Sequence, residues 1–530
     1  MKTIDKSTLT GINTTKNRKT GLEEKCAVLE HENEELKAKV KFYEEQFRLN
    51  QAQKYGSSSE KTDSSQIDMF NEPEKLSAQK SEEPDIEEVI TKRKTGKSKS
   101  KKTFDDLESE TIHYELPEDK MNCPTCNHGL HAMKIERRKE LKVIPPQVKL
   151  IYHDRIVYAC RKCDAEGTTG TIVRAPMPRP VILGSMVSPS LLAFIMEKKF
   201  NQAQPLYRQE KAWINFGVDI SRQNMANWII KGSDDWLKLL YNRLHQNLLQ
   251  EPIIHADETP LNVLDEKNNK TNYMWLYASA KHGSRSIVLY EYQPSRANKH
   301  PKKFLENFTG FRQTDGYPGY NKISEVTQVG CLAHARRKFD EAIKAAPKDA
   351  ELTTSKSKEA LLMFSRIYKL EKEFKELKSE ERYKRRLKES EPIITELKQW
   401  LDVESKRTLP KSKLGEAIKY ALNQWHKLIA FLEDGRIAVD NNLAERSIKP
   451  FVIGRKNWMF AKSPKGATSS AVCYSIIETA KANNLKPFQY LTYLFEELPN
   501  INPQNMDELD ALLPWSETLP KHIYQKLEES

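Results

Sequence analysis

The chain has 530 residues and a formal net charge of +12, and only 38% of its residues are hydrophobic, so part of it is expected to build no core. No apolar run approaches the roughly 18 residues of a membrane span, and residues 1–20 lack the apolar core of a secretory signal. The basic balance favours a polyanionic partner, nucleic acid first, and the length predicts about three or four domains. Two Cys-x-x-Cys pairs fit a reducing compartment, so we expect a cytoplasmic setting and no membrane partner.

Residues 20–50 carry a leucine repeat. Leu22, Leu29 and Leu36 recur at heptad spacing, and Asn33 would be the polar residue that fixes the register of the seam. The pattern predicts a short coiled coil that would make the protein a homo-oligomer; the alternative is a single amphipathic helix docked on its own protein. Residues 54–106 lose this periodicity and end in basic clusters. They are expected to form a disordered linker whose basic arm lies along phosphates, or only a solvated linker.

Two cysteine pairs predict a zinc-ribbon-like, zinc-binding domain at residues 115–174. Four thiolates complete the tetrahedral shell of a structural Zn²⁺ and leave no open position for catalysis. Hydrophobic residues between the pairs alternate through residues 141–152 as in strands, so a hairpin is expected to bring the pairs together. The alternative is two pairs of free thiols. The predicted ligands are Cys123, Cys126, Cys160 and Cys163.

Residues 185–250 are expected to form a helical DNA-binding domain. Helical patterns cover residues 190–199, 206–216, 222–231 and 236–249. The spacing of the second and third helices fits a helix-turn-helix, in which Arg222, Gln223 and Asn224 would reach base edges from the start of the recognition helix. A plain helical hairpin is the alternative, since short helix pairs are common.

Residues 251–482 change to a strand-rich pattern. Strands are expected at residues 253–257, 273–280, 286–292, 311–315 and 326–331, with helices at 302–308 and 333–345. In a ribonuclease-H-like α/β fold with this order, the first and fourth strands are neighbours. A charged helical insertion is expected at residues 350–436, a helix from about residue 441, and a C-terminal element at 483–530. The whole chain therefore predicts a multidomain α+β protein.

Three acids in this region are candidate ligands of divalent cations. Asp257 ends the first strand, Asp315 ends the fourth, and Glu445 lies on the helix after the insertion. Three converging carboxylates can hold two Mg²⁺ or Mn²⁺ ions about 4 Å apart and drive attack on a phosphodiester. Otherwise they are ordinary turn and helix acids. His255 shares the face of Asp257 and is either an accessory or a packed residue, while alternation aims Glu258 to the other face.

Several stretches resemble the transposases of the bacterial insertion sequence 66 family, and the resemblance covers nearly the whole chain. The matching stretches are residues 255–260, 314–320, 331–339, 440–450 and 454–458. Pro318 departs mildly from the family pattern in a turn. The resemblance implies a DDE transposase with a ribonuclease-H-like core and Asp257, Asp315 and Glu445 as its acids. It also implies a bacterial, nucleoid-associated setting and small accessory proteins encoded by the same element. The basic residues predicted to contact DNA near the third acid are Arg446, Lys449, Arg455 and Lys456.

The expected function is metal-dependent cleavage and strand transfer of DNA. The partners would be the terminal inverted repeats of the element and the target DNA, with two Mg²⁺ or Mn²⁺ ions and one structural Zn²⁺ as cofactors. Two alternatives are a DNA-binding regulator with an inert core and a nuclease that cuts without joining.

Overall fold

The computed structural model describes residues 40, 44, 147–159, 172–266, 271–281, 283–320, 326–346 and 351–525. The chain divides into two compact units, Met1–Ser58 with Ile151–Ser530, and Ser59–Leu150. The elements below belong to the first unit. The predicted linker and the four predicted zinc ligands lie outside the described residues, as does the predicted coiled coil except for Val40 and Glu44, which are both helical.

A short antiparallel pair, β1 (Val157–Ala159) and β2 (Ile172–Arg174), comes directly before and shortly after the second cysteine pair. The alternating pattern at residues 141–152 predicted an earlier strand, and this is wrong for its described part, because residues 147–156 form no strand. The side chains there are exposed, Leu150 by 75% and Tyr152 by 80%. Alternation alone does not make a strand, because strand preference reflects packing against neighbouring strands and burial of one face.

The region expected to be helical holds α4 (Pro189–Met196), α5 (Leu206–Asn215) and α6 (Arg222–Gly232). Ser188 and Ser221 cap α4 and α6, because each hydroxyl accepts the backbone N–H three residues on, at 3.1 and 3.2 Å. π-Helical turns follow α4 at Glu197–Asn201 and α6 at Ser233–Leu237. The second of these turns joins α6 to α7 (Lys238–Leu248), so the helix predicted to begin at residue 236 continues α6 instead.

The strands after α7 form a five-stranded mixed sheet with the order β5-β4-β3-β6-β7. The strands β3 (Ile253–Leu261), β4 (Asn272–Ser279) and β5 (Val288–Gln293) form an antiparallel meander, and β6 (Phe311–Gln313) and β7 (Thr327–Val329) run parallel to β3. The first and fourth strands of this region are therefore neighbours, as expected. The helix α8 (Lys299–Phe304) precedes β6 and α9 (Leu332–Ala345) follows β7.

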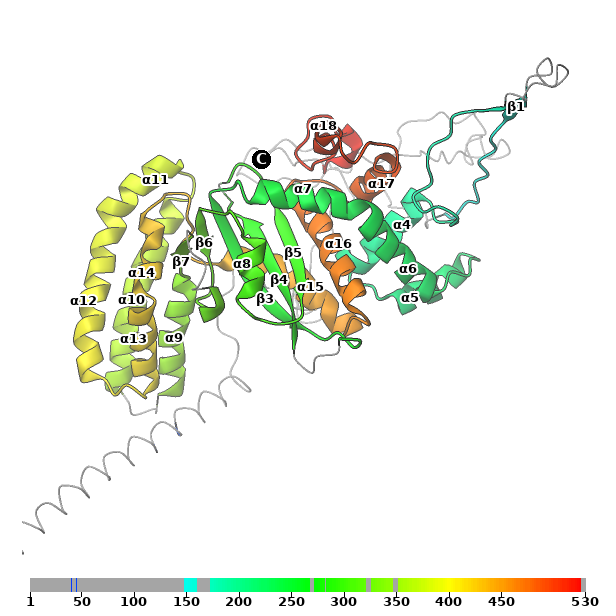
Figure 1. The fold of residues 1–530 in the computed structure, drawn as a ribbon. Helices are drawn as coiled ribbons and strands as arrows, with labels where there is room; N and C mark the ends of the chain where they lie inside the picture. The colour runs from blue at the N-terminus through cyan, green and yellow to red at the C-terminus, as the bar shows by residue number, and fades with distance from the viewer. Residues whose placement is uncertain are drawn as a thin grey trace, which may run out of the picture. The chain divides into compact units, whose positions relative to one another are not determined.

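Two long helices cover the meander, α15 (Asn442–Trp458) against β3 and β4, and α16 (Pro464–Ala482) against β5 (Figure 1). The edge strand β5 has unpaired backbone groups, which α16 satisfies. Thr479 Oγ1 accepts the N–H of Val288 at 3.0 Å, and Ser475 Oγ accepts that of Tyr290 at 2.7 Å. These two hydroxyls close the edge of the sheet to further strand pairing.

The segment predicted as a helical insertion holds three long helices, α10 (Glu351–Glu373), α12 (Glu391–Arg407) and α13 (Lys413–Asn423). Two shorter elements, α11 (Ser379–Arg385) and η6 (Arg386–Ser390), connect α10 to α12, and two more, α14 (Trp425–Leu428) and η7 (Ala430–Leu432), follow α13. These helices share a hydrophobic core with α9, distinct from the core under α15 and α16. Figure 1 shows them as a separate helical layer beside β7.

The C-terminal part of the chain returns to the first helical region. The helix α17 (Pro487–Glu497) packs against α4, and α18 (Met506–Asp510) contacts α7, where Arg243 donates two 2.6 Å hydrogen bonds to Asp510. The last element is η8 (Lys521–Ile523). Within the described part of the chain, no helix is both long enough and apolar enough to cross a membrane.

Candidate active site

The three acids predicted to act together are carried by three different elements. Asp257 lies in β3, Asp315 follows β6, and Glu445 lies in the first turn of α15. The parallel register pairs His255 with Gln313, and Asp257 and Asp315 each come two residues after this pair. Because α15 packs across β3, its first turn brings Glu445 toward the same end of the sheet.

The charges of Asp315 and Glu445 both act on Asp257. The pKa of Asp257 is raised to about 8, first by burial, then by the negative charge of Glu258, and further by the charges of Asp315 and Glu445. The backbone N–H of Glu258 donates to Asp257 Oδ1 at 2.8 Å and opposes this shift. A carboxylate cluster that repels itself in this way suits a hard divalent cation, which favours oxygen ligands.

Asp315 is held by a tight turn and by the insertion. The N–H of Tyr317 donates to Asp315 Oδ1 at 2.9 Å, and the hydroxyl of Tyr420, on α13, donates to the Asp315 carbonyl at 3.0 Å. Gly316 between them has φ +97°, in the region that favours glycine, so the break predicted after Asp315 has a conformational cause. The turn presents the Asp315 side chain at the end of β6.

Glu445 faces a histidine that the sequence interpretation missed. Glu445 Oε1 lies 3.8 Å from His334 Nδ1, and both atoms are buried without a hydrogen-bond partner. Two facing groups left unpaired in this way fit a bound cation or ligand between them. The available signal was the Cys331-to-His334 spacing inside one of the stretches that carry the family resemblance.

Cys331 is the third member of this group, since its sulfur, a His334 nitrogen and a Glu445 oxygen lie within 4.8 Å of one another. Burial raises the pKa of the Cys331 thiol to about 12, which keeps it protonated at neutral pH. Its sulfur accepts the backbone N–H of Asn441 at 3.2 Å. Because the thiolate is the form that binds metals, an ion bound by this group would have to displace the thiol proton of Cys331.

Asn441 joins the elements that carry the acids. Its Nδ2 donates to the Ala256 carbonyl at 3.0 Å, its Oδ1 lies 3.0 Å from His255 Nδ1, and its carbonyl accepts the N–H of Glu445 at 3.2 Å. Asn441 is fully buried and His255 is 1% exposed. Of the two roles considered for His255, its contacts are those of a packed residue. They leave no exposed ring for contact with a substrate.

Glu258, next to Asp257, has its own partners. It accepts hydrogen bonds from the Arg296 guanidinium, at 2.7 Å from Nε, and from the Tyr320 hydroxyl, at 2.7 Å. Burial still raises the pKa of Glu258, against the effects of these two donors. Arg296 in turn lies 3.6 Å from the centre of the Tyr317 ring. Glu258 therefore has an oppositely charged partner in Arg296, whereas the charges that act most strongly on Asp257 are all negative.

The residues predicted to bind DNA occupy two places. Arg222, Gln223 and Asn224 are exposed at the start of α6, where Glu210 Oε1 accepts the backbone N–H of Arg222 at 2.7 Å. The others lie along α15, with Arg446 and Lys456 exposed and Lys449 partly exposed. Arg455 donates to Thr259 Oγ1 at 3.1 Å and to the Pro260 carbonyl, so it anchors α15 to β3. Contact of any of these residues with DNA stays a prediction.

Comparisons with known proteins find four matching family models. The model described as "Transposase IS66 family" matches residues 184–469, and "IS66 C-terminal element" matches residues 475–515. The "zinc-finger binding domain of transposase IS66" matches residues 121–164, which include all four predicted zinc ligands. Residues 43–112 match "Transposase C of IS166 homeodomain".

Curated relatives from Sinorhizobium fredii match most of the chain. The protein y4jD is 32% identical over 410 residues, which is 74% of this chain and 78% of the relative. The protein y4qI is 30% identical over 425 residues, 77% of this chain and 75% of the relative. Both carry the description "Uncharacterized protein". The family model that matches residues 184–469 spans the helical region, the sheet and the insertion together.

Proposed function

This chain belongs to the IS66 family of transposases, and we propose that it cuts and joins DNA at a site formed by Asp257, Asp315 and Glu445. The observation that carries the proposal is the convergence of the three acids from β3, the end of β6 and the start of α15. The charges of Asp315 and Glu445 both act on Asp257, although more than a hundred residues separate Asp315 from Glu445 in sequence.

The sheet supports a ribonuclease-H-like core. An antiparallel meander followed by two strands parallel to its first member gives the order β5-β4-β3-β6-β7, which is the arrangement expected for that fold. The fold alone hosts many functions, so the proposal depends on the acids rather than on the sheet.

Asp257, Asp315 and Glu445 would hold two divalent cations, Mg²⁺ or Mn²⁺. Such ions, when bound, make an oxygen nucleophile available near neutral pH and stabilise the leaving oxygen of a phosphodiester. The three carboxylates would supply the negative charge that retains the ions. Burial and the neighbouring negative charges raise the pKa of Asp257, and bound cations would relieve the repulsion among those charges. His334 lies beside Glu445 and would limit the orientations open to that carboxylate.

The remaining parts would bind and pair DNA ends. Arg222, Gln223 and Asn224 would read base edges from the start of α6, as in a helix-turn-helix, while the cations of α15 would contact phosphates near the acids. The four cysteines would hold one structural Zn²⁺ in the segment that matches the family's zinc-finger model. A coiled coil within residues 20–50 would pair two subunits, and accessory proteins of the element would join the complex.

The test is cleavage and joining of element-end DNA by the purified chain with Mg²⁺. We expect Asp257→Asn, Asp315→Asn and Glu445→Gln each to lower the cleavage rate by at least about 10²-fold while leaving DNA binding intact. Wild-type cleavage by any one of them would remove that acid from the proposed site. Cleavage without joining to target DNA would indicate a nuclease, and DNA binding without cleavage would indicate a regulator.

A further inference from the structure

The segment 430–441, called the strap below, begins with the turn η7 and leads to α15, which carries Glu445. It is buried at Ile437 and Asn441, both fully covered. Its second half is hydrogen-bonded to the sheet region: Gln313 Nε2 donates to the Ala438 carbonyl at 2.7 Å, and the N–H of Leu332 donates to the Val439 carbonyl at 3.0 Å. The strap therefore reaches the acid site in a fixed position.

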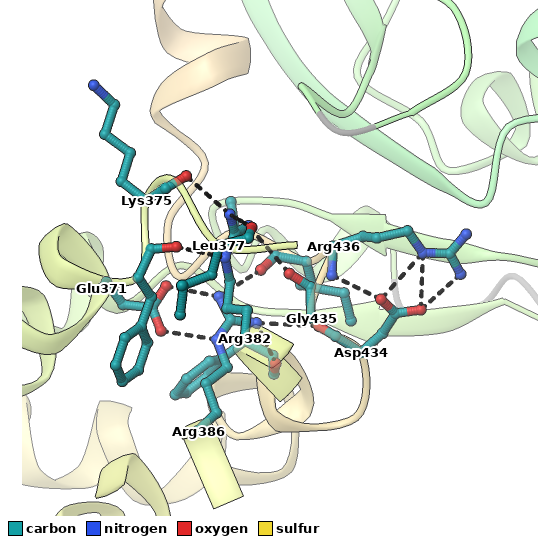
Figure 2. A network of polar contacts seen from close by, with 12 residues as sticks. Glu371, Lys375, Leu377, Arg382, Arg386, Asp434, Gly435 and Arg436 are labelled. Carbon is teal, nitrogen blue, oxygen red and sulfur yellow. Dashed lines mark hydrogen bonds and ion pairs between the residues drawn. The ribbon is translucent and has the colours of Figure 1, made fainter. Parts of the chain in front are cut away.

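The strap from Phe431 to Ile437 is held by the buried guanidinium of Arg386. Arg386 is 1% exposed and pairs with Glu371 at 2.8 Å from Nε and 2.7 Å from Nη2. Its Nη1 donates to the carbonyls of Phe431 at 2.8 Å and Asp434 at 3.1 Å, and its Nη2 to that of Ile437 at 2.9 Å. A single side chain thus gathers three carbonyls of the strap, as Figure 2 shows in part.

A second arginine binds the strap from the same side. Arg382 donates to the Gly435 carbonyl at 3.2 Å and to the carbonyls of Lys375 and Leu377, each at 3.1 Å, in the connection between α10 and α11 (Figure 2). Within the strap, the Asp434 carboxylate accepts the Arg436 N–H at 2.7 Å and closes the turn. The turn and the helical connection are therefore one hydrogen-bonded unit.

Packing of the helices alone would not require the buried charges and directed hydrogen bonds of this unit. Burying an ion pair such as Arg386 and Glu371 is no more stabilising in general than burying apolar residues of the same volume. The guanidinium has a planar fork of donors with fixed directions, so it sets where its acceptors lie. Here those acceptors are carbonyls of the segment that leads to Asn441 and, one helical turn later, to Glu445.

We propose that Arg386 is a positioning residue for the metal site. It fixes the strap against the insertion, and the strap fixes the start of α15 through Asn441, so that Glu445 stands beside Asp257. This inference rests on the proposed function, because it assigns to the insertion the task of placing the third acid. A residue with this role acts on cation affinity rather than on stability alone.

The experiment measures Mn²⁺ binding to the purified full-length chain by electron paramagnetic resonance of the free ion, beside the thermal midpoint of unfolding. Arg386→Lys keeps the charge that pairs with Glu371 but lacks the fork, and we expect it to weaken Mn²⁺ binding about tenfold. Arg382→Lys, which loses one strap contact, should shift the affinity in the same direction and less. If Arg386→Lys does not fold, the Mn²⁺ affinity of Arg382→Lys tests the positioning role instead.

The matched control is Glu404→Gln, which disrupts the buried Lys356–Glu404 pair between α10 and α12 in the same insertion. In the part of the chain that the structure describes, neither residue of this pair forms a hydrogen bond or ion pair with the strap. Mn²⁺ affinity should therefore stay within about twofold of wild type even if the thermal midpoint falls. Equal Mn²⁺ affinities in the folded Arg variants and wild type would overturn the positioning role, as would an equal loss of affinity in Glu404→Gln.

Asp257→Asn separates this inference from the proposed function. If that variant binds Mn²⁺ as wild type does, the metal site itself is wrong. If it loses Mn²⁺ while the folded arginine variants retain it, the site stands and the role of Arg386 falls.

Discussion

His255 and Asn441 meet in the core, with His255 Nδ1 3.0 Å from Asn441 Oδ1, although 186 positions separate them in sequence. Asn441 Nδ2 has to donate to the Ala256 carbonyl, so its Oδ1 faces the ring and Nδ1 is the donor. Burial lowers the pKa of His255 to about 4, which keeps the ring neutral at neutral pH. This contact joins the strand of Asp257 to the residue that starts the helix of Glu445.

Asn441→Ala should destabilise the fold through this contact. The substitution leaves His255 Nδ1 and the Ala256 carbonyl buried without partners, and we expect the free energy of unfolding to fall by about 3 kcal/mol in urea denaturation at neutral pH. The matched control is Asn457→Ala at an exposed position whose amide donates to the Ala203 carbonyl at 3.1 Å. That change should cost less than about 1 kcal/mol. Equal losses of unfolding free energy in the two variants would show that the buried contact stabilises the fold no more than the exposed one.

A second prediction concerns pH and the buried end of Glu291 on β5. Its Oε2 is buried without a partner, and burial raises the pKa of Glu291 from 4.5 to about 7. Between these values the folded state keeps a proton that the unfolded state has lost, so this group's contribution to stability falls as pH rises through that window. The side chain in Glu291→Gln cannot titrate. Above pH 7 the free energy of unfolding of this variant should therefore exceed that of wild type by up to about 3 kcal/mol.

The measurement is urea denaturation of both proteins at several pH values from about 4.5 to about 8. The difference in free energy of unfolding between Glu291→Gln and wild type should grow as the pH rises across this window. A difference that does not change with pH would mean that Glu291 is charged in the folded state throughout.

Much of the sheet could be predicted because hydrophobic alternation and fold knowledge both point to neighbouring strands for Asp257 and Asp315. The length of β3 could not be predicted in this way. The strand was expected to end at Asp257, yet it continues through Pro260 to Leu261. The short β6 pairs with β3 only up to His255, so beyond it one side of β3 is an edge, where a proline without an N–H is tolerated.

The contacts that complete the site depend on tertiary structure that no local pattern reports. His334 faces Glu445 only because α9 and α15 begin side by side, joined by the Asn441 N–H and the Cys331 sulfur at 3.2 Å. Arg386 reads in sequence as one of many cations in a charged helix, yet it is 1% exposed. Residue type, strand order and the family resemblance nominated the three acids, whereas their neighbours His334 and Asn441 became visible only in three dimensions.

Arg222 at the start of α6 should contribute to DNA recognition. We expect Arg222→Ala to weaken binding to element-end DNA by about 1–3 kcal/mol and to reduce discrimination against unrelated DNA. The control is Lys231→Ala, an exposed cation at the other end of the same helix. It should change affinity less and leave discrimination unchanged. Fluorescence anisotropy at fixed salt makes the comparison, and identical behaviour of the two variants would argue against a recognition helix.

The zinc prediction is tested by metal analysis. Purified protein should contain about one zinc per chain, and Cys123→Ser should release it because three thiolates hold the ion less well. Cys473→Ala is the control, since Cys473 is buried in the hydrophobic core and outside the segment that matches the zinc-finger model. Unchanged zinc content in Cys123→Ser would exclude that cysteine as a ligand.

The central claim is that Asp257, Asp315 and Glu445 hold divalent cations, and anomalous diffraction from crystals soaked in Mn²⁺ tests it most directly. The proposed site predicts anomalous peaks among the three carboxylates, within about 2.0–2.4 Å of their oxygens, and their loss in Asp257→Asn. Well-ordered carboxylates without a peak between them at saturating Mn²⁺, or peaks that persist in Asp257→Asn, would contradict the account.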